Sequence, residues 1–125
     1  MSKVLRAIFS GSRNFDDAAP VCIALEALKD KGSWVIVHGA ASGLDSLAGK
    51  LAEEYGFEVE SHPALWSEKG KAAGLIRNQE MVDLGAKVAF AFPLPDSRGT
   101  WDFVRRAKSA GIPVLLWSEG TFKRA

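Results

Sequence analysis

The sequence predicts a three-layer, doubly wound α/β fold with about five parallel strands in the order 3-2-1-4-5. Two observations predict it. Strand-like apolar runs alternate with helix-like amphipathic runs along the chain. Four of the five strand-like runs are almost continuously apolar, as parallel strands covered on both faces are. Right-handed crossovers then place a ligand crevice at the switch point between the first and fourth strands.

Five runs are expected to be strands. In chain order they are Val4 to Phe9, Trp34 to Val37, Phe57 to Ser61, Val88 to Phe92 and Val114 to Trp117. In the third run, Phe57 and Val59 alternate with Glu58 and Glu60, whereas the other runs are almost continuously apolar. Alternation of this kind indicates a strand with one face in water, so we expect the third strand at an edge of the sheet.

The helices are predicted from apolar residues that recur at helical spacing. Such stripes cover Val21 to Leu28, Leu44 to Tyr55 and Phe103 to Gly111. Lys71 to Leu84 is also expected to be helical, although its stripe is poorer. No linker, repeat or low-complexity segment interrupts the alternation, which favours a single domain over residues 1–125.

Composition limits the classes of protein that need to be considered. The chain has 125 residues, 47% of them hydrophobic, and a net charge of +1, which disfavours a main role in neutralising polyphosphate. A single cysteine, Cys22, excludes an internal disulfide and suits a reducing compartment. No signal peptide or membrane-length apolar run is visible, so a cytoplasmic location is expected. Because His38, His62 and Cys22 lack zinc-site spacing, we expect no required metal or cofactor, though Mg²⁺ could accompany a phosphorylated ligand.

Three glycine-containing turns follow predicted strands and should meet at one edge of the sheet. They are Gly11-Ser12-Arg13, Gly39 to Gly43 and Arg98-Gly99-Thr100. Helix N-termini carry unpaired N–H groups and the positive end of the helix dipole, so such turns favour a phosphate. The expected ligand-binding residues are Gly11, Ser12, Arg13, Gly39, Ala40, Ser42, Gly43, Asp45, Arg77, Asn78, Arg98, Gly99 and Thr100.

Several residues of these turns allow a structural interpretation as well as a binding one. Ser42-x-x-Asp45 fits a helix capping box, so Asp45 either caps the following helix or binds a ribose hydroxyl. Thr100 is the expected N-cap of the last helix, which leaves the amide of Gly99 free for an anion. His38, at a strand end, is either a packed, hydrogen-bonded residue or a catalyst.

The segment Gly70 to Met81 places Arg77 and Asn78 behind a cluster of small residues. Glycine costs helix stability there, which indicates that another group approaches closely. Arg77 is expected to hold a phosphate through its guanidinium fork. The alternative for Arg77 is a surface ion pair with Glu80 or Asp83.

Large aromatic residues give two further expectations. Trp66 follows His62-Pro63 and either stacks on a nucleobase or packs inside the protein. Trp101, Trp117 and Phe122 supply more aromatic surface than a small domain needs to expose. Such patches often mark interfaces, so we expect a homodimer or a higher symmetric oligomer.

Taken together, the motifs resemble those of the SLOG superfamily, which joins the Smf/DprA DNA-processing proteins to the LONELY GUY nucleotide phosphoribohydrolases. Gly11 to Arg13 and Gly39 to Asp45 resemble the DNA-processing branch, whereas Arg77 to Met81 with Gly99-Thr100 resembles the phosphoribohydrolases. The sequence is most similar to the small stand-alone YspA/YpsA-related SLOG family, through its Gly-Ser-Arg, His-Pro-Ala, Gly-Lys-Ala-Ala-Gly and Ile-Arg-Asn signatures. The resemblance runs from about Leu5 to Val114 and implies a Rossmann-like fold with a nucleotide-derived ligand.

The same resemblance implies candidate catalytic residues. In the phosphoribohydrolases, a Pro-Gly-Gly-x-Gly-Thr-x-x-Glu loop supplies a glutamate that works with an upstream arginine. Arg77 falls on that arginine, but Phe103 stands at the glutamate position. Asp102 lies one residue earlier, turned by about 100° around the helix axis. The catalytic candidates are therefore Arg77 with either Asp102 or Asp45.

We expect a protein that binds a phosphorylated nucleoside or nucleotide derivative, with ADP-ribose among the candidates. It would act as a sensor or as a hydrolase that cleaves an N-glycosidic bond. One alternative is a single-stranded DNA-binding module like the DNA-processing proteins, which near-neutral charge and the lack of an extended aromatic and basic surface disfavour. A second alternative is a degenerate domain that binds a protein partner.

Overall fold

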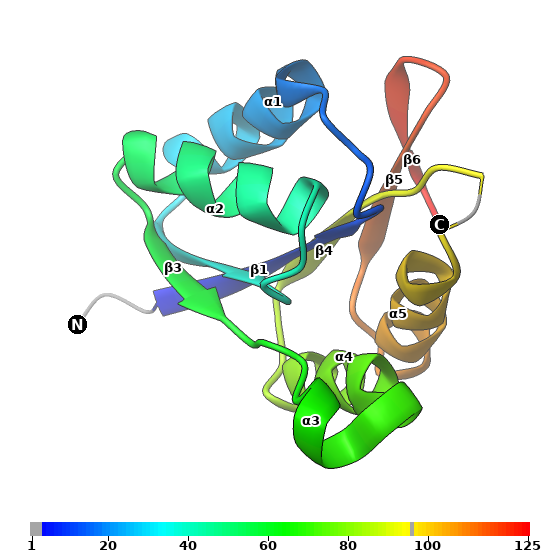
Figure 1. The fold of residues 1–125 in the computed structure, drawn as a ribbon. Helices are drawn as coiled ribbons and strands as arrows, with labels where there is room; N and C mark the ends of the chain where they lie inside the picture. The colour runs from blue at the N-terminus through cyan, green and yellow to red at the C-terminus, as the bar shows by residue number, and fades with distance from the viewer. Residues whose placement is uncertain (1–3, 96) are drawn as a thin grey trace.

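A computed structural model describes residues 4–95 and 97–125; Met1 to Lys3 and Asp96 of the third loop lie outside the described residues. One six-stranded sheet runs through the molecule in the order β3-β2-β1-β4-β5-β6 (Figure 1). Its strands are β1 (Val4–Gly11), β2 (Ser33–His38), β3 (Glu58–Ser61), β4 (Val88–Phe92), β5 (Val114–Ser118) and β6 (Thr121–Arg124). All neighbouring pairs are parallel except β5 with β6. The expected order 3-2-1-4-5 is confirmed, with β3 at one edge.

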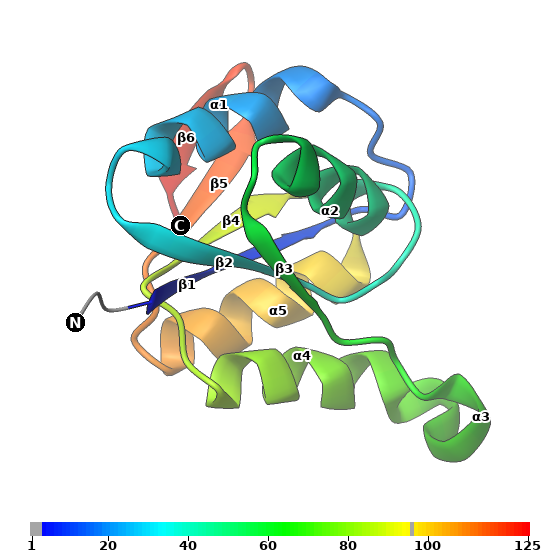
Figure 2. The ribbon, with the colours of Figure 1, turned by 90° about the vertical axis from the view of Figure 1, so that its left-hand side faces the viewer.

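Helices cover both faces of the sheet and complete the three layers (Figure 2). On one face lie α1 (Ala18–Lys29) and α2 (Leu44–Glu54), and on the other α4 (Ala73–Asp83) and α5 (Arg98–Ser109). A buried apolar cluster fills each interface: Phe9, Ile36 and Phe92 belong to the first, and Ile8, Met81 and Phe103 to the second. The sheet is thus buried on both faces at its centre, as the continuous apolar runs predict.

The helix expected over Lys71 to Leu84 begins two residues later and is preceded by separate short turns. These turns are α3 (Trp66–Lys69) and η1, a 3₁₀ turn over Gly70–Ala72. Gly70 has a backbone φ of +61°, which residues other than glycine rarely adopt. The chain therefore bends at Gly70 instead of continuing as one helix. The α3 turn projects beyond the end of α4 (Figure 2).

The sixth strand, β6, was not expected from the sequence. It forms an antiparallel hairpin with β5 through the two-residue turn Glu119-Gly120, in which both residues have positive φ. Positive φ at both residues is typical of a type I′ turn, whose backbone twist matches the twist of the two strands that it joins. The sequence pattern Glu-Gly predicts this turn only weakly, because Glu, unlike Asn or Asp, rarely occupies the first position of such a turn. Within residues 4–95 and 97–125, the helices are too short and too polar to cross a bilayer.

Candidate functional site

A cleft lies where β1 and β4 end, at the switch point of the sheet. Its volume is about 460 Å³. All three glycine-containing turns contribute to its walls, together with α4. The lining residues are Ser10, Gly11, Ser12, Arg13, Asn14, Ala41, Asp45, Arg77, Asn78, Met81, Leu94, Pro95, Ser97, Arg98, Gly99 and Thr100.

The first two turns are bound tightly to each other. The amide of Leu44 donates to the carbonyl of Ser12 at 3.1 Å, and the amide of Ser12 donates to the carbonyl of Phe92 at 3.1 Å. Gly43 has φ of +72°, and a Cβ there would lie 2.2 Å from the carbonyl carbon of Arg13. The sequence predicts that glycine here lets a ligand approach; instead, the close approach is made by the protein's own backbone.

The second turn folds around the side chain of Asp45. Its Oδ2 atom accepts from the amides of Gly39 at 3.1 Å and of Ala41 at 3.2 Å. Between them Ala40 has φ of +59°, a left-handed conformation that this pair of bonds stabilises. The expected capping box is wrong, because α2 is capped by the backbone of Gly43 without a side-chain hydrogen bond.

Burial dominates the electrostatics of Asp45. It is 5% exposed, and burial raises its pKa to about 6, against the opposing effects of the Ala41 amide, the Arg77 charge and the Gly39 amide. The carboxyl group therefore titrates closer to neutral pH than an exposed aspartate does. Its other oxygen, Oδ1, is buried and has no hydrogen-bond partner among the described residues.

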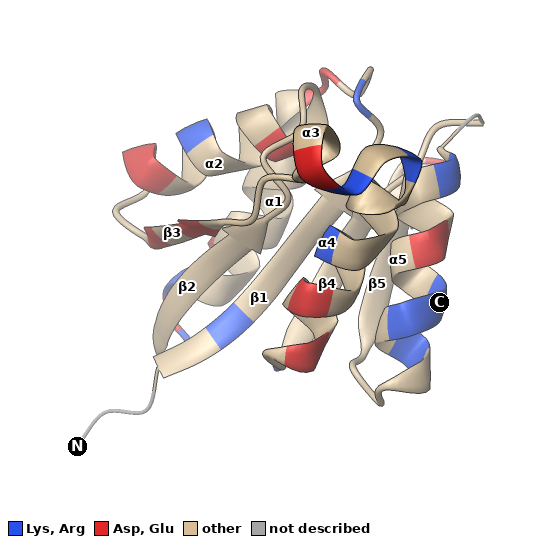
Figure 3. Ribbon diagram, turned by 60° about the horizontal axis from the view of Figure 1, so that its bottom comes forward, with Lys and Arg blue, Asp and Glu red and all other residues tan. Residues whose placement is uncertain are grey.

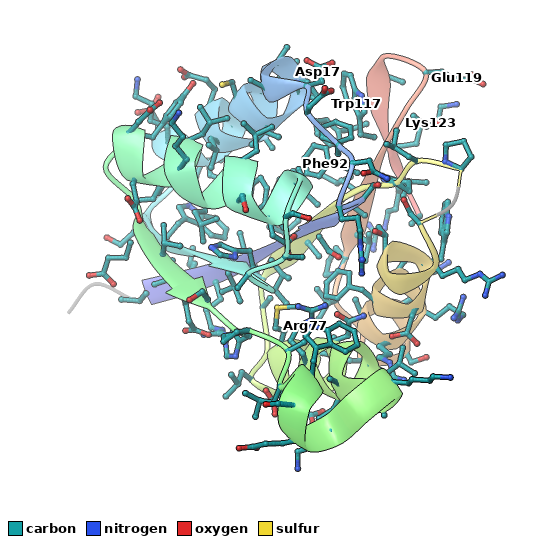
Figure 4. All side chains as sticks on the ribbon, viewed as in Figure 1. Asp17, Arg77, Phe92, Trp117, Glu119 and Lys123 are labelled. Atoms are coloured by element: carbon teal, nitrogen blue, oxygen red, sulfur yellow. The ribbon has the colours of Figure 1, made fainter. Side chains whose placement is uncertain are left out.

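Arg77 projects from α4 toward the strand ends (Figure 4). Its Nη1 group donates to the carbonyl of Gly39, and its Nε group donates to Oδ1 of Asn78 at 2.9 Å. These bonds replace the expected alternative of an ion pair with Glu80 or Asp83. A Cβ at Gly39 would lie 2.3 Å from Nη1, so a side chain there would displace the guanidinium from its present position. No hydrogen bond joins Nη2 to any of the described residues, so this edge of the fork can still donate to a ligand.

The third turn supplies the N-terminus of α5. The helix begins at Arg98 with Ser97 as its N-cap, so the expected N-cap at Thr100 is wrong. Ser97 Oγ accepts from the amide of Leu94 at 2.7 Å instead of capping the helix. The first-turn amides of Arg98, Gly99 and Thr100 have no acceptor within the helix. This end of α5 therefore presents donors and a positive dipole end to the cleft.

Asn78 and Asp102 fasten α4 to α5 behind the cleft. Asn78 Nδ2 donates to the carbonyl of Gly99 at 3.1 Å and to Oδ2 of Asp102 at 3.0 Å. The same Oδ2 accepts from Nε of Arg106 at 2.8 Å. Burial by itself raises the pKa of Asp102, but the bonds from Arg106 and Asn78 hold it below its ordinary value. Asp102 is not among the residues that line the cleft, whereas Asn78 and Asp45 are.

A second cavity of about 620 Å³ adjoins the cleft and shares Arg13, Ala41 and Arg77 with it. Trp66 lines this cavity together with Pro63 and Ala64 from the chain after β3, and its side chain is 53% exposed. The edge of the indole lies over Gly74, where a Cβ would be 3.3 Å away. Of the predicted second-turn residues, Gly39, Ala40 and Ser42 line this cavity and not the cleft itself.

Some lining residues were not predicted from the sequence. Asn14 and Ala41 lie inside turns that were predicted, so proximity to the motif could have identified them. Met81 lies one helical turn after Arg77 and carries no polar signal. His38 lies below the second turn, where Nδ1 accepts from the amide of Ala40 at 2.9 Å. Burial lowers the pKa of His38, and it lines neither cavity, so it is a packed residue of the turn.

A doubly wound sheet with a polar cleft at its switch point defines a Rossmann-like protein, and comparison with known proteins specifies the family. Residues 5–68 match the YspA, cpYpsA-related SLOG family, and the chain belongs to that family. The chain is also 44% identical over 121 residues to the Gene 61 protein of Mycobacterium phage D29, an alignment that covers 91% of this chain and 97% of that protein.

Proposed function

We propose that the cleft binds a phosphorylated nucleoside or nucleotide derivative. The observation that carries the proposal is the convergence of positive groups on one cleft: the Nη2 edge of Arg77, the exposed Arg13 and the first-turn amides of α5. These groups come from three elements that are far apart in the sequence. A phosphate placed among them would receive charge-assisted hydrogen bonds from several directions.

The adjoining cavity supports a nucleoside as the remainder of the ligand. Arg13 and Arg77 lie on the boundary between the two cavities, so a phosphate held by them would have space on either side. The exposed indole of Trp66 offers a planar surface on which a base can stack. A nucleotide with its phosphate in the cleft and its base near Trp66 would use both cavities.

A sensor is better supported than a hydrolase. The carboxylate of Asp102 is engaged by Asn78 and Arg106 outside the cleft lining. Phe103, at the position of the phosphoribohydrolase glutamate, is fully buried in the core and carries no acid–base group. Among the described residues, Asp45 is the carboxylate that lines the cleft, and hydrolysis of an N-glycosidic bond would depend on a carboxylate such as this one.

Binding of single-stranded DNA has less support. In Figure 3, the ribbon carries acidic residues on α4 beside basic residues on α5, and not a continuous basic stripe along these two helices. Proteins that hold single strands usually combine a basic groove with a row of aromatic residues. We place this nucleotide-binding role in the cytoplasm, which the free Cys22 suits.

Thermal unfolding with a panel of candidate ligands tests the proposal. The panel holds inorganic phosphate, nucleoside mono- and diphosphates, ADP-ribose and a single-stranded oligonucleotide. A ligand at 100 times its dissociation constant adds about 2.7 kcal/mol of stability, which raises Tm by several degrees. Stabilisation by a nucleotide derivative is expected. Stabilisation by the oligonucleotide alone, or by nothing in the panel, would contradict the proposal.

Arg77→Ala and Arg105→Ala form a matched pair for the same assay. Both remove one arginine, but Arg105 is exposed on the outer face of α5, outside the cleft. Loss of a charge-assisted contact at Arg77 is expected to weaken binding by about 10- to 150-fold, whereas Arg105→Ala should bind as the unaltered protein does. Equal affinity in the two variants would place the binding site elsewhere.

A further inference from the structure

Asp45 holds one carboxylate oxygen in place and leaves the other without a partner. Oδ2 receives the amides of Gly39 and Ala41, which fix the orientation of the side chain. Oδ1 is buried and accepts no hydrogen bond from residues 4–95 or 97–125. Asp45 itself lines the cleft. The carboxyl group is therefore held in a fixed orientation, and Oδ1 is an unpartnered acceptor on a residue that lines the cleft.

An unsatisfied carboxylate oxygen in a buried position is costly. Buried polar atoms are nearly always hydrogen-bonded. One that lacks a partner destabilises the folded state by the full cost of its desolvation. The nearby positive charge of Arg77 does not remove this cost, because Arg77 donates to Gly39 and Asn78 and forms no bond to Oδ1. An incoming ligand can supply the missing hydrogen bond.

The chemistry of Oδ1 limits which part of a ligand can approach it. A carboxylate oxygen accepts hydrogen bonds, so it repels a phosphate and attracts a hydroxyl or an N–H group. In a phosphorylated nucleoside, the hydroxyls nearest to the phosphate belong to the ribose ring. Arg77 of α4 and the first turn of α5 supply positive groups for the phosphate, and Asp45 of α2, which carries the unpartnered acceptor, lines the same cleft.

We propose that Oδ1 of Asp45 accepts a hydrogen bond from a ring hydroxyl of the ligand's ribose, so that the cleft selects phosphorylated ribose over a phosphorylated sugar without ring hydroxyls. This proposal rests on the proposed function and narrows its ligand class. The same contact would favour ribonucleotides over dideoxyribonucleotides. It gives Asp45 a role in specificity in addition to its role in folding the second turn.

Small probes test the proposal without requiring that the base be known. Methyl ribofuranoside 5-phosphate carries both ring hydroxyls, and tetrahydrofurfuryl phosphate carries neither. Calorimetric or NMR titration of the unaltered protein is expected to give at least about tenfold tighter binding of the riboside, the value for one hydrogen bond to a charged acceptor. Equal affinities for the two sugar phosphates would overturn the proposal. Failure of both probes and of inorganic phosphate to bind would instead overturn the proposed function.

Asp45→Asn separates the hydroxyl contact from the turn that it supports. The carbonyl oxygen of the amide can still accept from Gly39 and Ala41, while its NH₂ group replaces the free acceptor with a donor. The preference for the riboside is expected to fall severalfold, and the affinity for inorganic phosphate to rise, because a nearby negative charge is removed. Glu54→Gln, exposed at the end of the same helix, is the control and should change neither. An unchanged preference in Asp45→Asn would contradict the assignment.

Discussion

At the scale of single residues, the site combines buried charged side chains, which lower the stability of the fold, with glycines that leave space for their neighbours. Gly39 leaves space for the guanidinium of Arg77, and Gly43 leaves space for the backbone of Arg13. Asp45 and Arg77 are charged side chains that are largely withdrawn from water. Burial lowers the pKa of Arg77 and raises that of Asp45, so each charge is held at a cost. Costs of this kind are common where function and stability compete.

Asp45 makes this competition measurable. Its pKa in the folded protein, about 6, is higher than that of an exposed aspartate, about 4. The folded state therefore binds the proton more tightly than the unfolded state does. The ionised form thus costs stability above about pH 6, and this cost is lost as the pH falls toward about 4.

Asp45→Asn is accordingly expected to be more stable than the unaltered protein near pH 7.5, by on the order of 1–3 kcal/mol. The difference should shrink as the pH falls from about 6 to about 4, because the carboxyl group of the unaltered protein then becomes neutral. Thermal unfolding of the two proteins between about pH 4 and pH 7.5 measures this stability difference, and Glu54→Gln is the control. A stability difference that stays constant with pH would show that the burial of charge is not its cause.

At the scale of elements, the sequence predicts the sheet better than it predicts the turns. The five predicted strands are all present, and their order follows from the alternation of strands and helices. The start of α2 at Leu44 is as predicted, but two capping assignments were wrong: Asp45 does not close the capping box that was one of its two interpretations, and Ser97 instead of Thr100 is the N-cap of α5. Local patterns cannot reveal that Asp45 binds the amides of Gly39 and Ala41, because this depends on how the turn is packed.

The convergence of the three turns was predictable, whereas the supports behind them were not. Parallel strands place their carboxyl ends at one edge, which brings Ser12, Ala41 and Gly99 to one cleft. The link from Asn78 to Gly99 and Asp102 joins two helices across a sequence separation that no motif spans. Similarly, the contact between Arg77 and Gly39 follows from tertiary packing of α4 beneath the second turn.

Substitution of Asn78 tests whether its bonds to Gly99 and Asp102 stabilise the protein. Asn78→Ala removes the two bonds from Nδ2 and leaves Asp102 and the carbonyl of Gly99 without this donor. We expect a loss of about 1–3 kcal/mol in the free energy of unfolding, because the side chain is buried. Gln79→Ala on the same helix, where the side chain is less buried, should cost less. Chemical denaturation of both variants checks this, and equal losses would remove Asn78 from its supporting role.

At the scale of the whole molecule, several large apolar side chains are exposed on the surface. Trp101 is 40% exposed, whereas Trp117 and Phe122 are partly covered and pack edge to face against each other with ring centroids 4.9 Å apart. The aromatic surface near the C-terminal half is therefore centred on Trp101. Leu75 and Ile76 on α4 are also exposed.

We propose that the protein forms a homodimer, as the aromatic residues predict. Light scattering at tens of micromolar is expected to give about twice the chain mass of 13.5 kDa. Trp101→Ala is expected to shift the population toward the monomer, since a large exposed aromatic side chain often anchors an interface. A mass near 13.5 kDa for the unaltered protein would contradict the dimer, and an unchanged dimer in Trp101→Ala would locate the interface elsewhere.

The central claim is that one cleft, at the ends of β1 and β4, binds the phosphate of a nucleotide derivative. NMR titration of the ¹⁵N-labelled protein with inorganic phosphate, and then with the most stabilising nucleotide from the thermal panel, tests it most directly. The account predicts that the amide signals of Arg13, Ala41, Gly99 and Thr100 shift together and saturate, and that the same signals barely respond in Arg77→Ala. Saturable shifts confined to other parts of the chain, or no saturable shift with either ligand, would contradict it.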